Sequence, residues 1–73
     1  MTVLVNGERR EFAAGTAVTG VVRDLTGAGP GDAIPPRGIA VALNGAVVPR
    51  TQWSATVLAD GDRLEVLTAV QGG

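Results

Sequence analysis

The sequence predicts an α+β fold in which a mixed sheet of about five strands wraps one main helix. Two Asn-Gly pairs, Asn6-Gly7 and Asn44-Gly45, each separate two short strand-like runs, which is the pattern of β-hairpins. A single helical pattern lies between the hairpins, and a further strand-like run, residues 63–70, follows them. A sheet of this kind packs one face on its helix and leaves the other face to water.

The chain is short enough to form only one domain. It has 73 residues, of which 45% are hydrophobic and 18% charged, a globular rather than a disordered composition. A chain of this length buries only about 60–65% of its unfolded surface, so its core is thin. We expect a single domain over residues 1–70 and a flexible tail over residues 71–73.

The first hairpin is predicted over residues 2–12. Val3 and Val5 alternate with more polar neighbours, as in a strand with one buried face. Asn6-Gly7 favours a type I′ turn, because both central positions of that turn need a positive φ. Residues 8–12 then return as the second strand, and Ala13-Ala14-Gly15 ends it.

A helix is predicted between Thr16 and Gly27. The hydroxyl of Thr16 is suited to accept a hydrogen bond from an early backbone N–H, which makes Thr16 the expected N-cap. Gly27 is the expected stop. Gly20 lowers the intrinsic helix propensity, so the helix depends on packing. Its apolar face has the spacing i, i+3, i+4, i+7 and consists of Val18, Val21, Val22 and Leu25.

The second half begins with a loop rich in Gly and Pro, residues 27–38. It lacks the Lys-Ser/Thr of a phosphate-binding loop, and we interpret it as a solvated connector. Residues 39–44 and 46–48 form the second hairpin, Asp60-Gly61-Asp62 is a tight turn, and residues 63–70 form the last strand. Between them, Trp53 is expected to fill the core. Arg50 is expected to pair with Asp60 or Asp62.

The β-grasp, or ubiquitin-like, roll satisfies this order of elements and places the first, last and third strands side by side. Alternation assigns the side chains that face the helix: Val3, Val5, Ile39, Val41, Leu43, Leu64 and Val66. The outward side chains are Leu4, Ala40, Ala42, Glu65, Leu67 and Ala69. Leu4, Ala42 and Leu67 are predicted to form a small apolar patch that docks a partner. The alternative is that these are ordinary scattered surface residues.

The composition argues against several classes of function. The chain contains no Cys and no His, so it has no thiol nucleophile, imidazole base or soft metal ligand. Six basic and seven acidic residues argue against nucleic acid and anionic membranes as partners. No apolar run approaches the ~20 residues that span a bilayer. We expect a cytoplasmic, non-catalytic protein without a signal peptide, catalytic residue or metal site of its own.

The remaining candidate reactive group is the C-terminal carboxylate of Gly73. Neither Gly72 nor Gly73 has a Cβ, so the backbone can thread a slot that any side chain would block. Gly72 would then give a partner enzyme access to the carboxylate of Gly73. The alternative is an inert, frayed terminus.

The chain resembles the ThiS family, the sulfur carrier proteins of thiamine biosynthesis. The resemblance covers essentially the whole chain and rests mainly on Val48-Pro49-Arg50-x-x-Trp53, Asp60-Gly61-Asp62 and the Gly72-Gly73 end. The related small subunit of molybdopterin synthase usually has paired prolines before its diglycine, where this chain has Thr68-Ala69-Val70-Gln71. The loop over residues 27–38 departs from the family pattern, because it looks longer.

The resemblance implies a defined chemistry at Gly73. An E1-like adenylyltransferase of the ThiF type would activate the carboxylate with Mg-ATP, so this chain would bind no cofactor itself. A sulfur donor system, a cysteine desulfurase with its persulfide, would convert the acyl-adenylate to a thiocarboxylate. A thiazole synthase of the ThiG type would then take the sulfur. The alternatives are a sulfur carrier for molybdopterin or cysteine synthesis, a ubiquitin-like protein modifier, and an interaction module with an inert tail.

Overall fold

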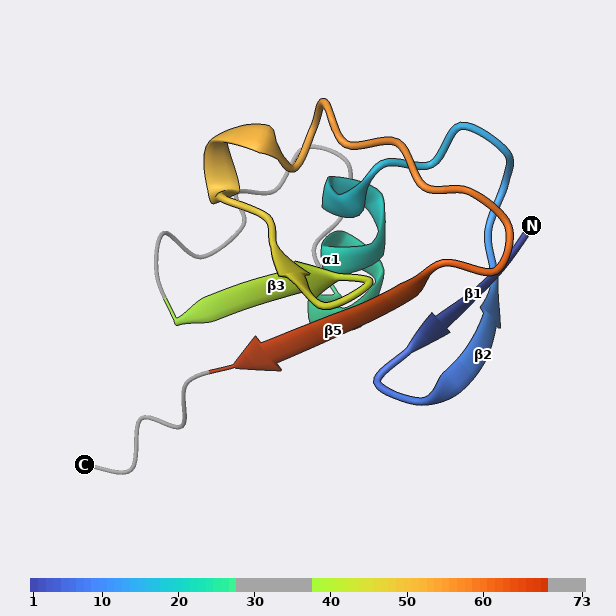
Figure 1. Ribbon diagram of the computed structural model, residues 1–73, viewed down its shortest axis with the longest axis horizontal. Coiled ribbons are helices and arrows are strands. Elements are labelled where there is room, and N and C mark those ends of the chain that lie inside the picture. Colours follow the sequence, from blue (N-terminus) through green and yellow to red (C-terminus); the bar gives the residue numbers. More distant parts are fainter. Residues whose placement is uncertain (28–37, 69–73) are drawn as a thin grey trace.

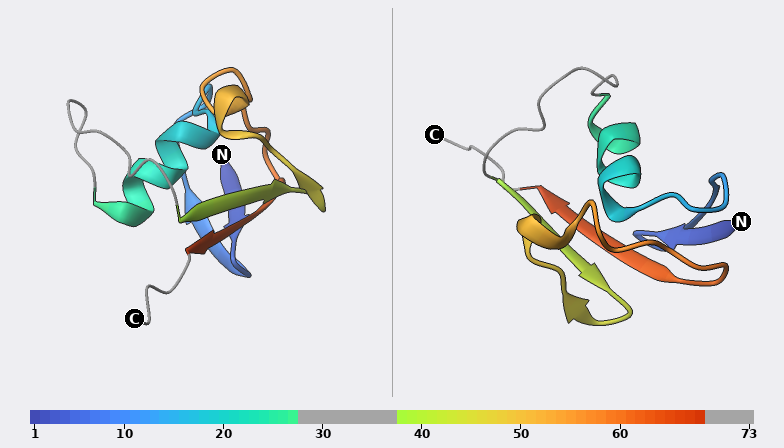
Figure 2. Two further views of the ribbon diagram at one scale, coloured as in Figure 1. Left: turned by 90° about the vertical axis from the view of Figure 1, so that its left-hand side faces the viewer. Right: turned by 90° about the horizontal axis from the view of Figure 1, so that it is seen from above.

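The computed structural model of this chain describes residues 1–27 and 38–68. These residues form a five-stranded sheet and one α-helix. The helix lies on one side of the sheet (Figures 1 and 2). Most of the predicted loop and the whole predicted tail, residues 71–73, lie outside the described residues. Within the described part, no helix is long and apolar enough to cross a bilayer.

The elements follow the predicted order, and the sheet has the predicted β-grasp topology. The strands are arranged β2-β1-β5-β3-β4, so the first, last and third strands are neighbours. β1 and β5 are parallel, and the other neighbours are antiparallel. The bounds are β1 (Thr2–Val5), β2 (Glu8–Glu11), α1 (Val18–Thr26), β3 (Ile39–Leu43), β4 (Ala46–Val47), the short 3-10 helix η1 (Arg50–Gln52) and β5 (Arg63–Thr68).

Both Asn-Gly turns have the predicted backbone conformation. Asn6 and Gly7 have φ angles of 51° and 84°, and Asn44 and Gly45 have φ angles of 49° and 87°. Asparagine tolerates the left-handed region better than most residues, and glycine enters it freely. These turns close the β1–β2 and β3–β4 hairpins and fix their registers.

The predicted N-cap of the helix is wrong. The N-cap is Ala17, and the hydroxyl of Thr16 instead donates to the carbonyl of Ala13 at 2.7 Å. Ala17 has an extended backbone and forms an isolated bridge with Val57, which brings residues 53–58 against the start of the helix. Backbone carbonyls of that segment then accept the N–H groups of Val18 and Thr19. A side-chain cap is therefore replaced by backbone partners that are distant in sequence.

The predicted end and buried face of the helix are confirmed. Gly27 is the C-cap in the left-handed conformation, with a φ of 76°. Leu25 packs partly buried against the core. The buried core consists of Val3, Val5, Val18, Val21, Val22, Val41, Trp53, Leu58, Leu64 and Val66. The strand residues that alternation assigned to the helix side are therefore buried, except that Ile39 and Leu43 are partly buried against the same core.

Trp53 fills the core as predicted, because only 3% of it is exposed. Its indole N–H donates to the carbonyl of Val48 at 2.9 Å, which satisfies the polar end of the ring. For Arg50, the predicted pairing with Asp60 or Asp62 stays a prediction. Its guanidinium lies 5.1 Å from the centroid of the Trp53 ring, while Asp60 and Asp62 accept backbone N–H groups.

Candidate functional site

β5 is the strand that leads to the C-terminus, and it lies in the middle of the sheet. On one side it pairs with β3 along its whole length, from Leu43 opposite Leu64 to Ile39 opposite Thr68. On the other side it pairs with β1, which ends at Val5. Figure 1 shows that β5 runs toward the end of the sheet away from the N-terminus. β5 is therefore paired on both sides at its start and on the β3 side as far as Thr68.

The side chain of Asn6 continues the β1–β5 pairing beyond the end of β1. The backbone N–H of Asn6 donates to the carbonyl of Leu64 at 2.9 Å, as in an ordinary ladder. Its side-chain Oδ1 then accepts the N–H of Val66 at 2.8 Å, and its Nδ2 donates to the carbonyl of Val66 at 3.1 Å. A carboxamide has the same donor and acceptor groups as a peptide unit, so it adds one more rung to the ladder.

Asn44, in the turn between β3 and β4, binds the start of β5 in a corresponding way. Its Oδ1 accepts the N–H of Arg63 at 2.9 Å, and its Nδ2 donates to Oδ1 of Asp62 at 3.2 Å. The predicted tight turn at residues 60–62 is confirmed, with Gly61 at a φ of 86°. Asp60 supports it by accepting the N–H of Thr2 at 2.7 Å.

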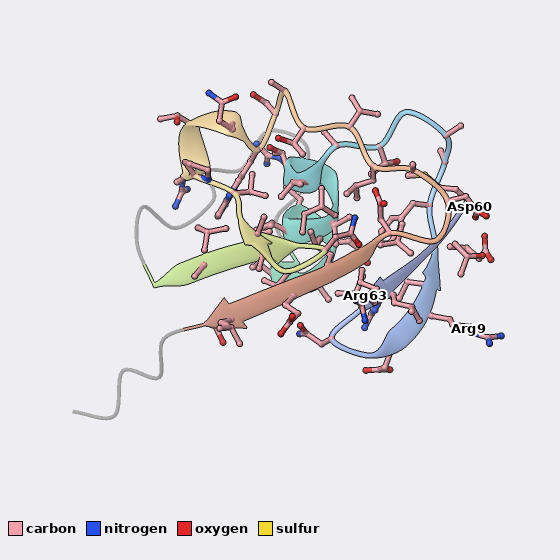
Figure 3. All side chains as sticks on the ribbon, in the orientation of Figure 1. Arg9, Asp60 and Arg63 are labelled. Carbon is pink, nitrogen blue, oxygen red and sulfur yellow. The ribbon has the colours of Figure 1, made fainter. Side chains whose placement is uncertain are left out.

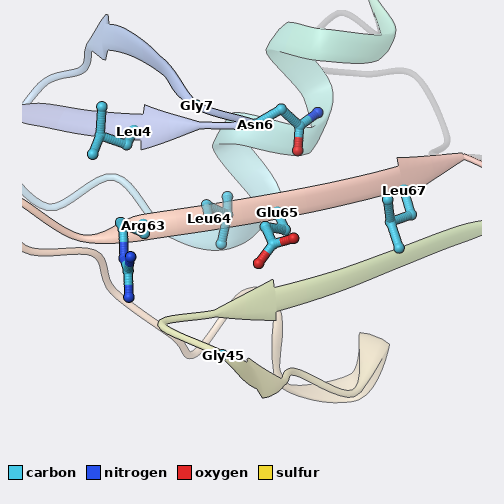
Figure 4. A pocket seen from close by; sticks show the side chains of 8 residues that line it. All are labelled: Leu4, Asn6, Gly7, Gly45, Arg63, Leu64, Glu65 and Leu67. Atoms are coloured by element: carbon cyan, nitrogen blue, oxygen red, sulfur yellow. The ribbon is translucent and has the colours of Figure 1, made fainter.

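A shallow groove of about 540 Å³ lies on the sheet face away from the helix (Figure 4). Two of the three predicted patch residues, Leu4 and Leu67, line it, and Leu67 is 64% exposed. The third, Ala42, lies opposite Glu65 in register and is not part of the lining. The groove is lined by Leu4, Asn6, Gly7, Gly45, Arg63, Leu64, Glu65 and Leu67.

The apolar part of this face extends over β3, as alternation predicted, and over β4, which alternation did not indicate. Ala40 lies opposite Leu67, and Ala42 lies opposite Val47 on the edge strand. Val47 is 78% exposed, the most exposed large apolar side chain among the described residues. Directly opposite residues point to the same face of a sheet, so these side chains share the outer surface. The high β propensity of Val47 was visible in the sequence, but its register was not.

Two arginines flank Leu4 on the same face. Arg9 of β2 and Arg63 of β5 are both register partners of Leu4, and Figure 3 shows both side chains projecting from the sheet. Neither forms an ion pair with another described residue. The ion pairs found there join Arg10 to Asp24 and the N-terminal amine to Glu11. The lining of the groove is therefore apolar at Leu4 and Leu67 and carries one positive charge, on Arg63, and one negative charge, on Glu65.

The described residues contain no cluster of three or more acidic, His or Cys side chains that could hold a metal ion. Nor does the sequence supply a thiol or an imidazole. The two glycines predicted to present the terminal carboxylate, Gly72 and Gly73, lie outside the described residues.

Comparison with known proteins decides the family. The model of the ThiS family matches residues 3–73, almost the whole chain. The chain belongs to the ThiS family. It is 30% identical over 73 residues to the sulfur carrier protein ThiS of Escherichia coli, and the match covers all of both chains. The predicted family resemblance is thus confirmed.

Solved structures and a longer relative agree with this assignment. The crystal structure of the thiamine biosynthesis protein ThiS from Geobacter metallireducens matches the whole of both chains, with a TM-score of 0.74 and 32% identity. A thiazole synthase of Paramagnetospirillum magneticum is 30% identical over 73 residues. This chain spans 20% of the length of that synthase, so the match concerns one part of a larger protein.

Proposed function

We propose that this member of the ThiS family is a sulfur carrier for thiamine biosynthesis whose C-terminal carboxylate, at Gly73, becomes a thiocarboxylate. The main support is the match to the E. coli sulfur carrier protein ThiS over the full length of both chains. The central position of β5 adds to it, because the strand that precedes the diglycine in sequence lies between two neighbouring strands. A carrier needs a stable body and one reactive terminus.

The proposed chemistry begins with activation, because a free carboxylate is a poor acyl donor. An E1-like adenylyltransferase of the ThiF type joins the carboxylate of Gly73 to the AMP part of Mg-ATP and releases pyrophosphate. A persulfide from a cysteine desulfurase system attacks the acyl carbon, and AMP leaves. A thiol then cleaves the S–S bond by exchange and leaves the thiocarboxylate. A thiazole synthase of the ThiG type takes up this sulfur.

The residues of this chain suit the role of a co-substrate better than that of a catalyst. Without a cysteine, the chain can carry reactive sulfur only at its terminal carboxyl group. The glycines at positions 72 and 73 leave that group accessible in a narrow active site. ATP, the metal ion and the acid–base groups are then supplied by the partner enzymes.

We further propose that the adenylating enzyme docks on the groove between Leu4 and Leu67, with Ala42 at its margin. The groove lies on the face opposite the helix and includes the strand that leads to the tail. Leu67 combines 64% exposure with a position one residue before the end of β5. An enzyme bound here would hold the carrier close to its reactive terminus.

Intact-mass spectrometry tests the proposed function directly. The chain is incubated with its adenylating enzyme, the desulfurase system and ATP. Its mass should rise by about 16 Da, the exchange of one oxygen for sulfur, because no thiol of the chain competes for modification. A variant that lacks Gly73 is the control and should keep its mass. An unchanged mass of the full chain, with a known carrier modified in parallel, would refute the carrier function.

Genetic complementation separates thiamine from the alternative pathways. Deletion of the gene should cause a requirement for the thiazole moiety that the full chain relieves and the chain without Gly73 does not. A requirement for molybdopterin or cysteine instead would assign the carrier to another pathway. Lysine-linked conjugates of the chain in a cell lysate would favour the ubiquitin-like modifier.

A further inference from the structure

We propose that Asn6 is a positioning residue for the reaction at the C-terminus, because its side chain fixes the point at which the chain leaves the sheet. This inference rests on the proposed activation of Gly73. It concerns how the body of the carrier presents that group, and it assigns to a turn residue a role beyond forming the turn.

The first argument is the geometry at the end of β1. β1 ends at Val5, yet the groups of Val66 on this side of β5 still have partners, since the carboxamide of Asn6 binds both its N–H and its carbonyl. These two bonds span 60 positions in sequence. Figure 4 shows Asn6 at the end of β1 beside β5. A glycine or alanine at this position could form the turn or the strand end but could not bind Val66.

The second argument is the asymmetry of the pairing around the end of β5. On the β3 side, register pairs continue through Leu67 to Thr68. On the β1 side, the bonds to Val66 are the last hydrogen bonds with β1 or its turn among the described residues. Loss of the carboxamide would leave the last three residues of β5 held by β3 alone. A strand held on one side frays and changes direction more readily.

The third argument is the consequence for the reaction. Rates in a bound complex depend steeply on placement, and an error of about 1 Å at the reacting group can cost about 100-fold. The chain beyond β5 ends in glycines, which have no side chains to correct such an error by packing. The direction set at Val66 therefore contributes to where the carboxylate of Gly73 arrives.

The chain offers a matched control in Asn44. It occupies the same turn position with nearly the same φ, 49° against 51° for Asn6. It also binds β5 through its carboxamide, but at Arg63, at the other end of the strand. Asn6→Gly and Asn44→Gly each remove one carboxamide, and each keeps its turn because glycine accepts a positive φ without strain.

The decisive experiment is steady-state adenylation of the two variants by the E1-like enzyme, followed as pyrophosphate release. We expect Asn6→Gly to lower kcat about tenfold with KM within about twofold of wild type, and Asn44→Gly to leave both within about twofold. Equal losses in the two variants would mean that Asn6 only stabilises the fold. A rise in KM alone would mean that Asn6 is a contact of the partner. Either result would overturn the proposal.

Amide hydrogen exchange gives a second readout that needs no partner. Asn6→Gly should speed exchange at Val66 about tenfold or more relative to Arg63, and Asn44→Gly should do the reverse. Unchanged protection of Val66 in Asn6→Gly would overturn the proposal. If the wild-type chain is not adenylated at all, the proposed function fails. If it is adenylated and both variants match it, the role of Asn6 alone fails.

Discussion

Leu67 and Ala40 lie directly opposite each other on β5 and β3, and Leu67 of this pair lines the outer groove. Ala40 has a small side chain, so the neighbouring Leu67 remains 64% exposed. A partner can therefore bury most of a leucine there without any rearrangement of the sheet. At about 25 cal/mol per Å² of apolar surface, one such side chain can contribute about 1–2 kcal/mol to docking.

Leu67→Glu tests this docking surface. We expect KM for the carrier in the adenylation assay to rise about tenfold or more, because a charge replaces an apolar contact, while kcat changes little. Thermal unfolding should shift only slightly, since the side chain is exposed. Val47→Glu is the control, because Val47 is also exposed but does not line the groove. Equal effects of the two variants on KM would exclude the groove as the specific interface.

From the charges of Arg9 and Arg63 we predict that the chain associates with an acidic partner surface and that this association depends on salt. Neither forms an ion pair with another described residue, so both charges are available for long-range attraction. We expect the double variant Arg9→Gln/Arg63→Gln to raise KM several-fold at low salt and to reduce its dependence on ionic strength. Arg10→Gln serves as the control, since Arg10 pairs with Asp24 of the helix. An unchanged salt dependence in the double variant would contradict this prediction.

Asp62 and Asp24 should contribute very differently to stability. The carboxylate of Asp62 accepts the N–H of Ala59 at 2.8 Å and the Nδ2 of Asn44 at 3.2 Å, so it links the turn before β5 to the second hairpin. We expect Asp62→Ala to lower the free energy of unfolding by about 1–2 kcal/mol. Asp24→Ala breaks only a surface ion pair with Arg10 and should cost about 0–0.5 kcal/mol.

Urea denaturation of both variants measures this difference. The free energy of unfolding should fall with urea concentration at the same slope in both variants, so the midpoint urea concentrations report the difference in stability directly. The prediction is wrong if Asp24→Ala costs as much as Asp62→Ala.

Truncation of Trp53 should lower the free energy of unfolding more than truncation of any other side chain in the core. Trp53 is 3% exposed and is the only large aromatic buried there, so Trp53→Ala should cost about 3–5 kcal/mol. That loss approaches the total stability of a small domain, so part of the variant should be unfolded at room temperature. Trp53→Phe keeps much of the volume but removes the N–H bonded to Val48, and it should cost less. Circular dichroism during thermal unfolding ranks the two variants. A fully folded Trp53→Ala with wild-type stability would show that the core does not depend on this side chain.

The sequence was most informative where local chemistry alone determines the structure. Asn6-Gly7 and Asn44-Gly45 have the predicted positive φ angles, because few other residue pairs adopt that turn. Alternation in the strands and the helical spacing at Val18, Val21 and Val22 correctly identified the buried side chains of the sheet and helix, whereas the burial of Leu58 was not predicted. Family and fold followed from these patterns and from the motifs near Trp53 and the terminus.

Features set by contacts between distant segments were not predictable in this way. Thr16 has a good capping side chain, but the bridge between Ala17 and Val57 supplies other partners for the helix start. Leu4 and Leu67 line one groove as predicted, but the absence of Ala42 from its lining depends on details of strand register and packing that a period of two does not specify. The bonds of Asn6 to Val66 were missed for the same reason, although its position in a turn was recognised.

The middle strand of this sheet is also its last strand in sequence. β5 joins β1 to β3, so the two hairpins become one sheet only through residues 63–68. The sheet therefore forms as a unit only when segments far apart in sequence have met, which slows folding relative to a fold built from local contacts.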